Sequence, residues 1–369
     1  MKRCLSLILF CFVSFCSYSQ IIQKPDYIRN DKRILLEALT EYESNNFGTS
    51  LKLVEEAKEQ RRQQSDWEYT TLQNSFKSFD VKKAGDNLND ITAVLLERQD
   101  YEAIELIKKY SVSRGADEIA GSKKNLLAYI KKNRQYPEAD KLAGDIYKIE
   151  GEYELANKYY TEALKNAQIL DVPDEKFDIL YELADISYTL NNDDDYEKEL
   201  LLIVAQDDSF KDESLIKAMK STIASVKPDC VEKFFKLYRS NNYRVLTAYA
   251  NLSQFYETKN KMDKALICSS LCALTGFTKI FDVVSKRNPN FEYDGLYSLL
   301  QEASCYEDIV NWGINNNVWK GFHVFAENAY KTTNPIFAVQ LFTVLANCSP
   351  EEYWRNRAEL RLKEITLTR

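Results

Sequence analysis

The chain has 369 residues, of which 45% are hydrophobic and 28% are charged, and its formal net charge is −7. This balance is typical of a folded chain rather than a disordered one. Ten glycines and seven prolines are too few for the many tight turns of a β-sandwich or barrel, and one histidine excludes histidine metal clusters.

The N-terminus has the three parts of a secretory signal peptide. Lys2 and Arg3 are positive, an uncharged apolar stretch runs from Cys4 to Cys16, and residues 17–19 include small side chains. We expect a signal peptide at residues 1–19, because the stretch is shorter than the roughly 20 residues of a membrane-spanning helix. An alternative is lipidation at Cys16, although Phe15 precedes it where a small residue is needed. No transmembrane helix is expected after this segment.

The mature chain would keep 47 basic and 56 acidic residues, a net charge of −9. Its densest basic run, from Lys58 to Arg62, is offset by neighbouring glutamates. An acidic protein without a basic patch binds nucleic acid poorly, so no nucleic-acid partner is expected.

Five cysteines remain after the signal peptide. Their number is odd, so at least one is free or pairs between chains. Cys268 and Cys272 lie four apart in an apolar context, which favours small buried core residues over a redox pair or a zinc site. A structural disulfide remains an alternative. The five are Cys230, Cys268, Cys272, Cys305 and Cys348.

Apolar residues recur at intervals of three and four along the chain, which is the helical period. Stripes begin at Ile34, Leu51 and Ile91, and they are separated by short breaks. Short breaks force neighbouring helices to be antiparallel. The breaks are Asn45-Asn46, Arg98 to Asp100, Gly151-Glu152 and Asn191 to Asp195. A further helix is expected from Pro350, with Ser349 as its N-cap.

A spaced pattern of small and aromatic residues recurs. From Gly144 it places Tyr147, Gly151, Tyr153, Ala156 and Tyr160 at fixed distances, and weaker copies start at Ser253 and Ala326. Small residues suit close contacts between antiparallel helices, and bulky residues fill the adjacent holes. The pattern resembles the tetratricopeptide repeat (TPR), a 34-residue helix–turn–helix unit, most clearly over residues 137–168.

The resemblance implies an all-α, right-handed superhelical solenoid of antiparallel helix pairs. Its length predicts roughly eight pairs, with three repeat units between Gly144 and Ser253 and two between Ser253 and Ala326. We expect degenerate helical repeats over 20–133, central TPR-like repeats over 134–206, and TPR-like repeats with a capping helix over 207–369.

In such a solenoid the first helices line a groove that holds a peptide or protein helix. The groove positions are found by counting from the small residue of each first helix. They are Glu138, Lys141, Asp145 and Lys148; Thr247, Ala250, Gln254 and Glu257; and Lys320, His323, Glu327 and Tyr330.

Candidates for chemistry are few. His323 and Glu327 lie one helical turn apart, but the sequence places no nucleophile or metal beside them. The run Asp193 to Asp195 lacks the glycine and distant glutamate of a calcium loop. We therefore expect no catalytic residue, no metal and no cofactor.

The leading hypothesis is an exported, periplasmic scaffold that binds a protein or peptide and is not an enzyme. One alternative is a cell-wall enzyme or carbohydrate-binding protein, for which only residues 277–316 leave room; its candidate acids are Glu292, Asp294, Glu302 and Asp308. A further alternative is an outer-membrane assembly factor anchored by lipid at Cys16.

Overall fold

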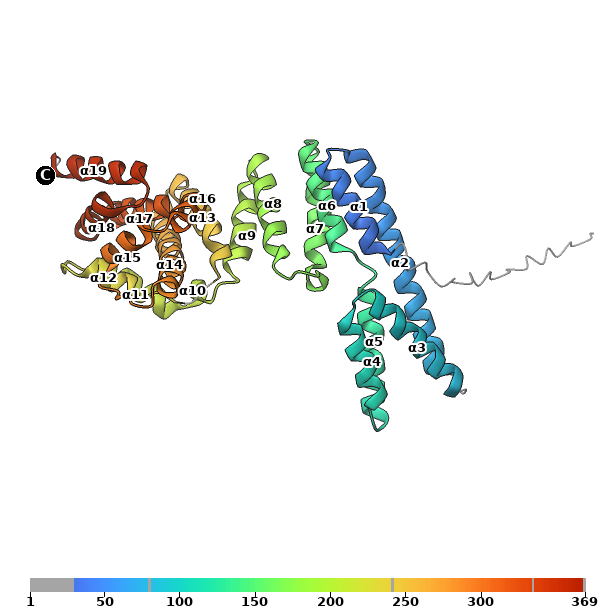
Figure 1. Cartoon of the computed structure of the whole chain (residues 1–369). Helices are drawn as coiled ribbons and strands as arrows, with labels where there is room; N and C mark the ends of the chain where they lie inside the picture. The colour runs from blue at the N-terminus through green and yellow to red at the C-terminus, as the bar shows by residue number, and fades with distance from the viewer. Residues whose placement is uncertain (1–29, 79–80, 240–241, 334, 368–369) are drawn as a thin grey trace, which may run out of the picture. The chain divides into compact units, whose positions relative to one another are not determined.

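The structure is a computed structural model that describes residues 30–78, 81–239, 242–333 and 335–367. The predicted signal peptide and the alternative lipid site at Cys16 lie outside these residues. Every regular element in the described ranges is a helix, and none is a strand (Figure 1). The predicted all-α class is confirmed.

Several turns between paired helices each contain one residue with left-handed backbone angles. Asn45, Gln99, Asn191 and Asn260 have φ of 61°, 59°, 55° and 56°, and Gly151 has φ of 80°. Asparagine and glycine tolerate this conformation better than other residues. All five lie in the short breaks that the sequence predicted or at the matching position of the repeat pattern.

The chain forms two compact units. Of the described residues, the first unit comprises those up to Glu152 together with Lys165–Asp171, and the second comprises Tyr153–Leu164 together with those from Val172 onward. The clearest sequence repeat, residues 137–168, is therefore divided between them. This division does not follow the segment boundaries expected at residues 134 and 207.

The first unit is organised around one 31-residue helix, α2. It packs against α1, α3, α5 and α6, while α4 packs against α3 and α5. Trp67 and Leu72 of α2 share a core with Ile91, Leu95 and Leu126. The helices are α1 (Asp31–Glu43), α2 (Phe47–Lys77), α3 (Val81–Glu97), α4 (Tyr101–Val112), α5 (Ala116–Lys132) and α6 (Pro137–Ile149), followed later by the 3₁₀ turn η1 (Ala167–Ile169).

The second unit contains three stacked helix pairs and a terminal helix. Within it α8 packs on α9, α9 on α13, α13 on α14, α14 on α17, α17 on α18, and α18 on α19. These helices are α8 (Glu175–Thr189), α9 (Asp193–Val204), α13 (Leu246–Thr258), α14 (Met262–Arg287), α17 (Val318–Thr332), α18 (Pro335–Cys348) and α19 (Glu352–Leu367). Helix α7 (Tyr153–Lys165) precedes them.

Two insertions lie between these pairs along the sequence. One contains α10 (Asp208–Lys211), α11 (Glu213–Ile223), α12 (Cys230–Phe235) and the 3₁₀ turn η2 (Tyr243–Val245), and the other contains α15 (Leu296–Ser304) and α16 (Glu307–Asn315).

The inserted helices contact α14 and α18 but do not separate consecutive pairs, because α9 meets α13 and α14 meets α17 directly. The expected ladder of three and then two complete repeat units is therefore wrong for this part of the chain.

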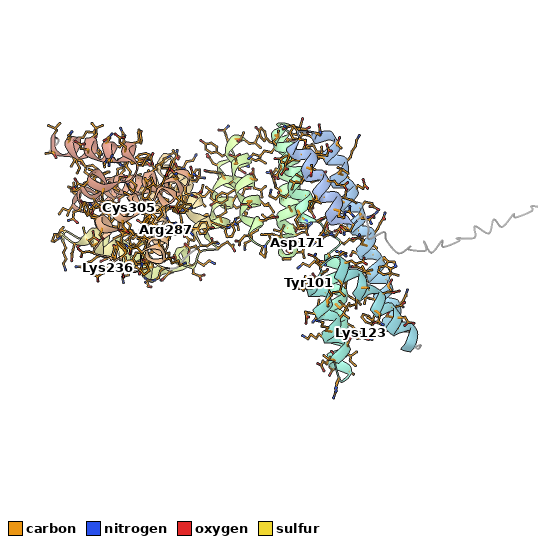
Figure 2. The ribbon with its side chains drawn as sticks, in the orientation of Figure 1. Tyr101, Lys123, Asp171, Lys236, Arg287 and Cys305 are labelled. Atoms are coloured by element: carbon orange, nitrogen blue, oxygen red, sulfur yellow. The ribbon has the colours of Figure 1, made fainter. Side chains whose placement is uncertain are left out.

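Polar contacts tie the second insertion to the stack. Arg287, at the end of α14, binds Asp308 of α16 through two contacts, with Nη1–Oδ1 at 2.5 Å and Nη2–Oδ2 at 2.7 Å (Figure 2 labels Arg287). Asn288 Nδ2 donates to Glu302 Oε1 at 2.9 Å. These polar pairs fix how the second insertion packs on α14.

Helix α14 is the central helix of the second unit. It is long and apolar enough to cross a membrane, but 72% of its most apolar window is buried inside the protein. A Cβ added to Gly276 would lie 2.8 Å from Val318 Cγ1, and one added to Gly321 would lie 3.2 Å from Cys272 Sγ. These small residues let α14 and α17 approach closely.

The last helix begins slightly later than predicted. Helix α19 starts at Glu352, and the buried Ser349 Oγ has no hydrogen-bond partner. Ser349 therefore does not cap the helix, and that detail of the prediction is wrong. Ala358 and Ile365 of α19 are buried, so the helix does cover the end of the stack, as expected.

Candidate functional site

Two adjoining hollows lie between the first helices of the three stacked pairs. The aromatic hollow, of about 450 Å³, lies between α8, α9 and α13. Its lining residues are Tyr181, Ala184, Asp185, Tyr188, Asp193, Tyr196, Asn251, Gln254, Phe255, Thr258 and Lys259.

The amide hollow, of about 280 Å³, lies between α13, α14 and α17 and shares Asn251 and Gln254 with the first. Its other lining residues are Thr247, Ala250, Ser253, Glu257, Ser269, Cys272, Asn316, Asn317, Lys320, Gly321 and Val324. We refer to the two hollows together as the groove.

Three rings form one wall of the aromatic hollow. The ring centroids of Tyr188 and Tyr196 are 5.3 Å apart, and those of Tyr196 and Phe255 are 5.6 Å apart. Lys259 Nζ lies 5.5 Å from the Phe255 centroid and forms an ion pair with Asp193. The wall thus places aromatic rings beside the Asp193 carboxylate.

Tyr181 fixes how α8 meets α13 at the floor of this hollow. Its hydroxyl donates to Arg244 O at 2.6 Å and accepts from Ala248 N at 3.1 Å. Burial raises the pKa of the Tyr181 phenol, so the group stays neutral. Both bonds go to backbone atoms, so the hydroxyl links α8 to the start of α13.

The amide hollow contains several side chains that can bind peptide groups. Asn251, Gln254, Asn316 and Asn317 each carry an amide, and Lys320 lies on the facing helix α17. An amide side chain can both donate to and accept from a main chain. This lining therefore suits an extended or helical polypeptide better than an apolar small molecule.

The structure brings together five of the predicted groove residues. Thr247, Ala250, Gln254, Glu257 and Lys320 all line the amide hollow. Thr247, Gln254 and Lys320 are exposed. Glu257 also forms an ion pair with Lys331.

The other three residues predicted on α17 lie against α19. His323 is 5% exposed, and its ring lies 5.1 Å from that of Trp354 and 5.2 Å from that of Phe342. Glu327 forms an ion pair with Arg361, with 2.9 Å between Oε1 and Nε, and the Arg361 guanidinium lies 5.0 Å from the Tyr330 ring. The prediction that His323 meets a partner is therefore corrected, because helix α19 buries it.

His323 and Glu327 do not form a hydrogen-bonded pair. Nε2 and Oε1 are 3.8 Å apart, and Nδ1 has no partner. Burial, with Arg357 and Arg361 nearby, lowers the pKa of His323 to about 4. The imidazole is therefore neutral near pH 7 and contributes packing.

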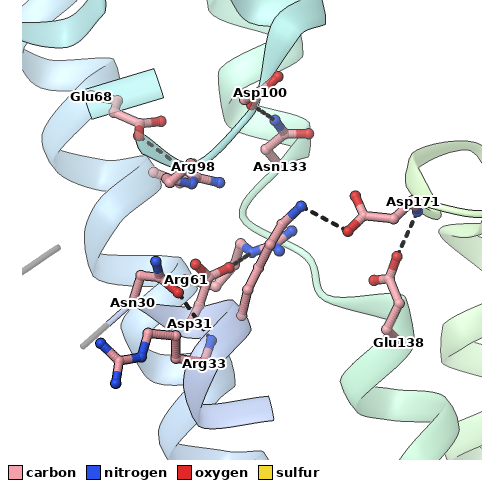
Figure 3. A network of polar contacts seen from close by, with 12 residues as sticks. Asn30, Asp31, Arg33, Arg61, Glu68, Arg98, Asp100, Asn133, Glu138 and Asp171 are labelled. Atoms are coloured by element: carbon pink, nitrogen blue, oxygen red, sulfur yellow. Dashed lines mark hydrogen bonds and ion pairs between the residues drawn. The ribbon is translucent and has the colours of Figure 1, made fainter. Parts of the chain in front are cut away.

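The four predicted residues on α6 belong to the first unit. Glu138 Oε1 accepts from Asp171 N at 2.7 Å, and burial raises the pKa of this carboxyl (Figure 3). Lys141 Nζ and Asp145 Oδ2 are 2.9 Å apart, and Lys148 is half-buried. These contacts hold three of the side chains within the first unit.

A polar cavity of about 340 Å³ in the first unit is flanked by ion pairs. Lys32, Arg61 and Arg98, which line it, pair with Asp171, Asp31 and Glu68, respectively (Figure 3). Burial would raise the pKa of Asp31, but Arg61 and Arg98 outweigh it, so the pKa lies below its ordinary value. Lys32, Arg61 and Arg98 therefore each already have a carboxylate partner within the unit.

The sequence analysis missed the groove residues of α8. Counting from the buried Ala184, as was done from Ser253, places Tyr181 three residues before it, Asp185 one after and Tyr188 four after. All three line the aromatic hollow. The same spacing could have found them, but groove positions were counted only from Gly144, Ser253 and Ala326.

The other sequence candidates have structural roles. Asp193 to Asp195 form the first turn of α9, where Asn192 Oδ1 accepts from Asp195 N at 3.4 Å. Acids are favourable at a helix N-terminus. The five cysteines are all free, and only Cys305 is exposed (Figure 2). The predicted buried thiols are confirmed.

The acids suggested for a cell-wall enzyme lack the buried environment that raises the pKa of a catalytic acid. Glu292, Asp294, Glu302 and Asp308 are not buried. Hydrogen bonds from Asn288 and Tyr306 lower the pKa of Glu302, whereas a catalytic acid of this kind needs a raised pKa. Among the residues that the structure describes, no group of three or more His, Cys, Asp and Glu side chains is placed to hold a metal ion.

Comparison with known proteins gives likenesses in sequence and in structure. No protein-family model matches the chain. A protein of Treponema pallidum (strain Nichols) described as "Uncharacterized protein" is 28% identical over 354 residues, which cover 94% of this chain and 94% of that protein. The crystal structure of the P58(IPK) TPR domain is 12% identical, covers 85% of this chain and 97% of that chain, and has a TM-score of 0.20. At that TM-score, the description of the fold rests on the helices of this chain alone.

Proposed function

We propose that this protein is a non-enzymatic interaction scaffold that binds a segment of a partner protein in the groove between α8, α13 and α17. The observation that carries the proposal is that the first helices of three consecutive pairs line two adjoining hollows. Aromatic, amide and charged side chains line these hollows, which suits recognition of a polypeptide.

The scaffold acts outside the cytoplasm, in a bacterial periplasm. This part of the proposal rests on the N-terminal residues 1–19 and on nothing in the folded units. Sequencing the N-terminus of the protein purified from its own cells tests it, and we expect Gln20 as the first residue. A lipid-modified Cys16 would instead support an envelope-anchored protein, and an intact Met1 would contradict export.

Site-specific photo-crosslinking in intact cells tests the groove. Benzoylphenylalanine replaces Gln254, which lines both hollows. The matched control replaces Tyr297 of α15, which is 44% exposed and lines neither hollow. We expect a discrete crosslinked partner from position 254 and none from position 297. The same products from both positions would contradict a partner-binding groove.

A further inference from the structure

We propose that the aromatic hollow receives an arginine side chain of the partner segment, which makes the scaffold selective for a basic sequence. This inference rests on the proposed function and names the chemistry that the groove recognises. It depends on the aromatic wall, the carboxylates and the volume of one hollow.

The aromatic wall has the geometry that attracts a cation. The rings of Tyr188, Tyr196 and Phe255 follow one another at 5.3 and 5.6 Å between centroids, and their planes are inclined to one another by 47° and 73°. A cation within about 6 Å of a ring centroid is attracted by the negative face of the ring. The planar guanidinium of arginine also stacks on aromatic faces, whereas a lysine ammonium binds as a point charge.

The protein already places one of its own cations on this wall. Lys259 Nζ lies 5.5 Å from the Phe255 centroid and pairs with Asp193. The rings of Tyr188 and Tyr196 extend the same surface farther along the hollow. No cation–π contact to either of these rings is observed among the described residues. The wall therefore has aromatic surface beyond the part that Lys259 uses.

The charges that line the hollow favour a second cation over an anion, and its volume leaves room for one. The hollow is lined by two carboxylates, Asp185 and Asp193, and by one ammonium, Lys259. Its volume of about 450 Å³ is many times the roughly 30 Å³ occupied by one water molecule. The whole chain carries a formal charge of −7, which also favours the approach of a basic segment.

The groups that would bind the guanidinium are accessible. Tyr188 is 66% exposed, and Asp185 is exposed beside it on α8. Tyr196 is half-buried at the start of α9, and Phe255 is 8% exposed at the base. An arginine can therefore reach the wall without opening the core.

The test compares two probes of the same shape, N-acetyl-arginine amide and N-acetyl-citrulline amide, which lacks the charge. The full chain carries 3-fluorotyrosine at position 188 only, and its fluorine resonance is followed in each titration. We expect a saturable shift with the arginine probe at a concentration at least fivefold lower than with the citrulline probe. Equal half-saturation, or no shift with either probe, would overturn the proposal.

Two substitutions of equal charge separate a local contact from a general charge effect. Asp185→Asn removes a carboxylate of the hollow, and Asp194→Asn removes an exposed carboxylate nearby on α9 that does not line it. We expect Asp185→Asn to weaken arginine binding about fivefold and Asp194→Asn to leave it within twofold. Equal effects of the two changes would contradict the arginine site.

Failure of the arginine site and failure of the proposed function give different results. A partner crosslinked at position 254 together with equal binding of the two probes would keep the scaffold and reject the arginine site. Selective arginine binding without a crosslinked partner would keep the cation preference of the hollow and reject the groove as the place where a protein binds.

Discussion

At the scale of single residues, the turns show where the backbone carries strain. Gln99 adopts φ of 59° between α3 and α4, a conformation that costs most residues about 1–2 kcal/mol but that glycine adopts freely. We predict that Gln99→Gly stabilises the first unit by about 0.5–1 kcal/mol, since the added chain entropy of glycine offsets part of the gain. Urea unfolding followed by circular dichroism measures this.

The matched control for this change is Asn260→Gly in the second unit. Asn260 has nearly the same φ, 56°, but asparagine tolerates this conformation. The control should therefore shift stability by no more than a few tenths of a kcal/mol. A stabilisation of the same size at both positions would show that strain at Gln99 is not the cause.

His323 gives the second unit a defined dependence on pH. Its pKa is about 4 in the folded chain because burial disfavours the charged imidazole, against 6.5 for an ordinary histidine. Between these values the unfolded chain binds a proton that the folded chain does not. Stability is therefore complete above pH 6.5 and falls as the pH drops toward 4, by roughly 2–3 kcal/mol from this group.

Comparing the wild type with His323→Phe isolates this contribution. Phenylalanine keeps a ring against Phe342 and Trp354 but does not titrate. Unfolding curves followed by tryptophan fluorescence should show the wild type losing stability relative to the variant below pH 6.5 and running parallel above it. Parallel curves down to pH 4 would mean that His323 becomes protonated inside the folded unit.

At the scale of elements, the contact between α14 and α17 depends on small residues. A Cβ at position 276 would lie 2.8 Å from Val318 Cγ1, and the β-branched valine has little freedom to move. We predict that Gly276→Ala destabilises the second unit by about 1–3 kcal/mol through overpacking. Chemical unfolding measures the loss, and Val318→Ala in the same chain should recover part of it.

A glycine in open surroundings supplies the control. Gly121 lies within α5 and has no heavy atom within 4 Å of an added Cβ. Gly121→Ala should therefore stabilise the first unit by about 0.5–1 kcal/mol, because alanine favours a helix. Opposite signs at the two positions would establish the close packing of α14 and α17, and stabilisation at both would contradict it.

At the scale of the whole molecule, the sequence predicts what depends on local spacing. The helical period, the turns at Asn45 and Gly151, and the small-residue contacts at Ser253 follow from neighbours along the chain. The same spacing placed Gln254 and Lys320 on the lining of the amide hollow. Local rules suffice here because one turn of helix determines which side chains share a face.

Features that depend on distant contacts escaped prediction. Residues 208–245 and 296–315 have helical periodicity like the rest of the chain, but they form insertions rather than stacked pairs. His323 occupies a groove position by counting, but Phe342 of α18 and Trp354 of α19 pack against its ring and bury it. Periodicity identifies the apolar face of a helix but does not identify the helix that covers it.

The thiols report on the fold of the whole second unit, because all five lie within it and their reactivity depends on burial. Burial raises the pKa of Cys268, Cys272 and Cys348 to about 12, and a thiol reacts through its thiolate. Only Cys305 is exposed, and all five cysteines of the described residues are free. We predict that native protein beginning at Gln20 reacts rapidly with iodoacetamide at Cys305 alone, whereas the unfolded chain reacts at all five.

Intact-mass spectrometry without reductant measures both states, and Cys305→Ser should abolish the native reaction. A shortfall in the unfolded chain would reveal a disulfide and contradict the five free thiols. Rapid native labelling at Cys268 or Cys272 would instead mean that α14 opens. Since α14 packs on both α13 and α17, such opening would also disrupt the groove, so the thiol count tests the structural premise of the proposed function.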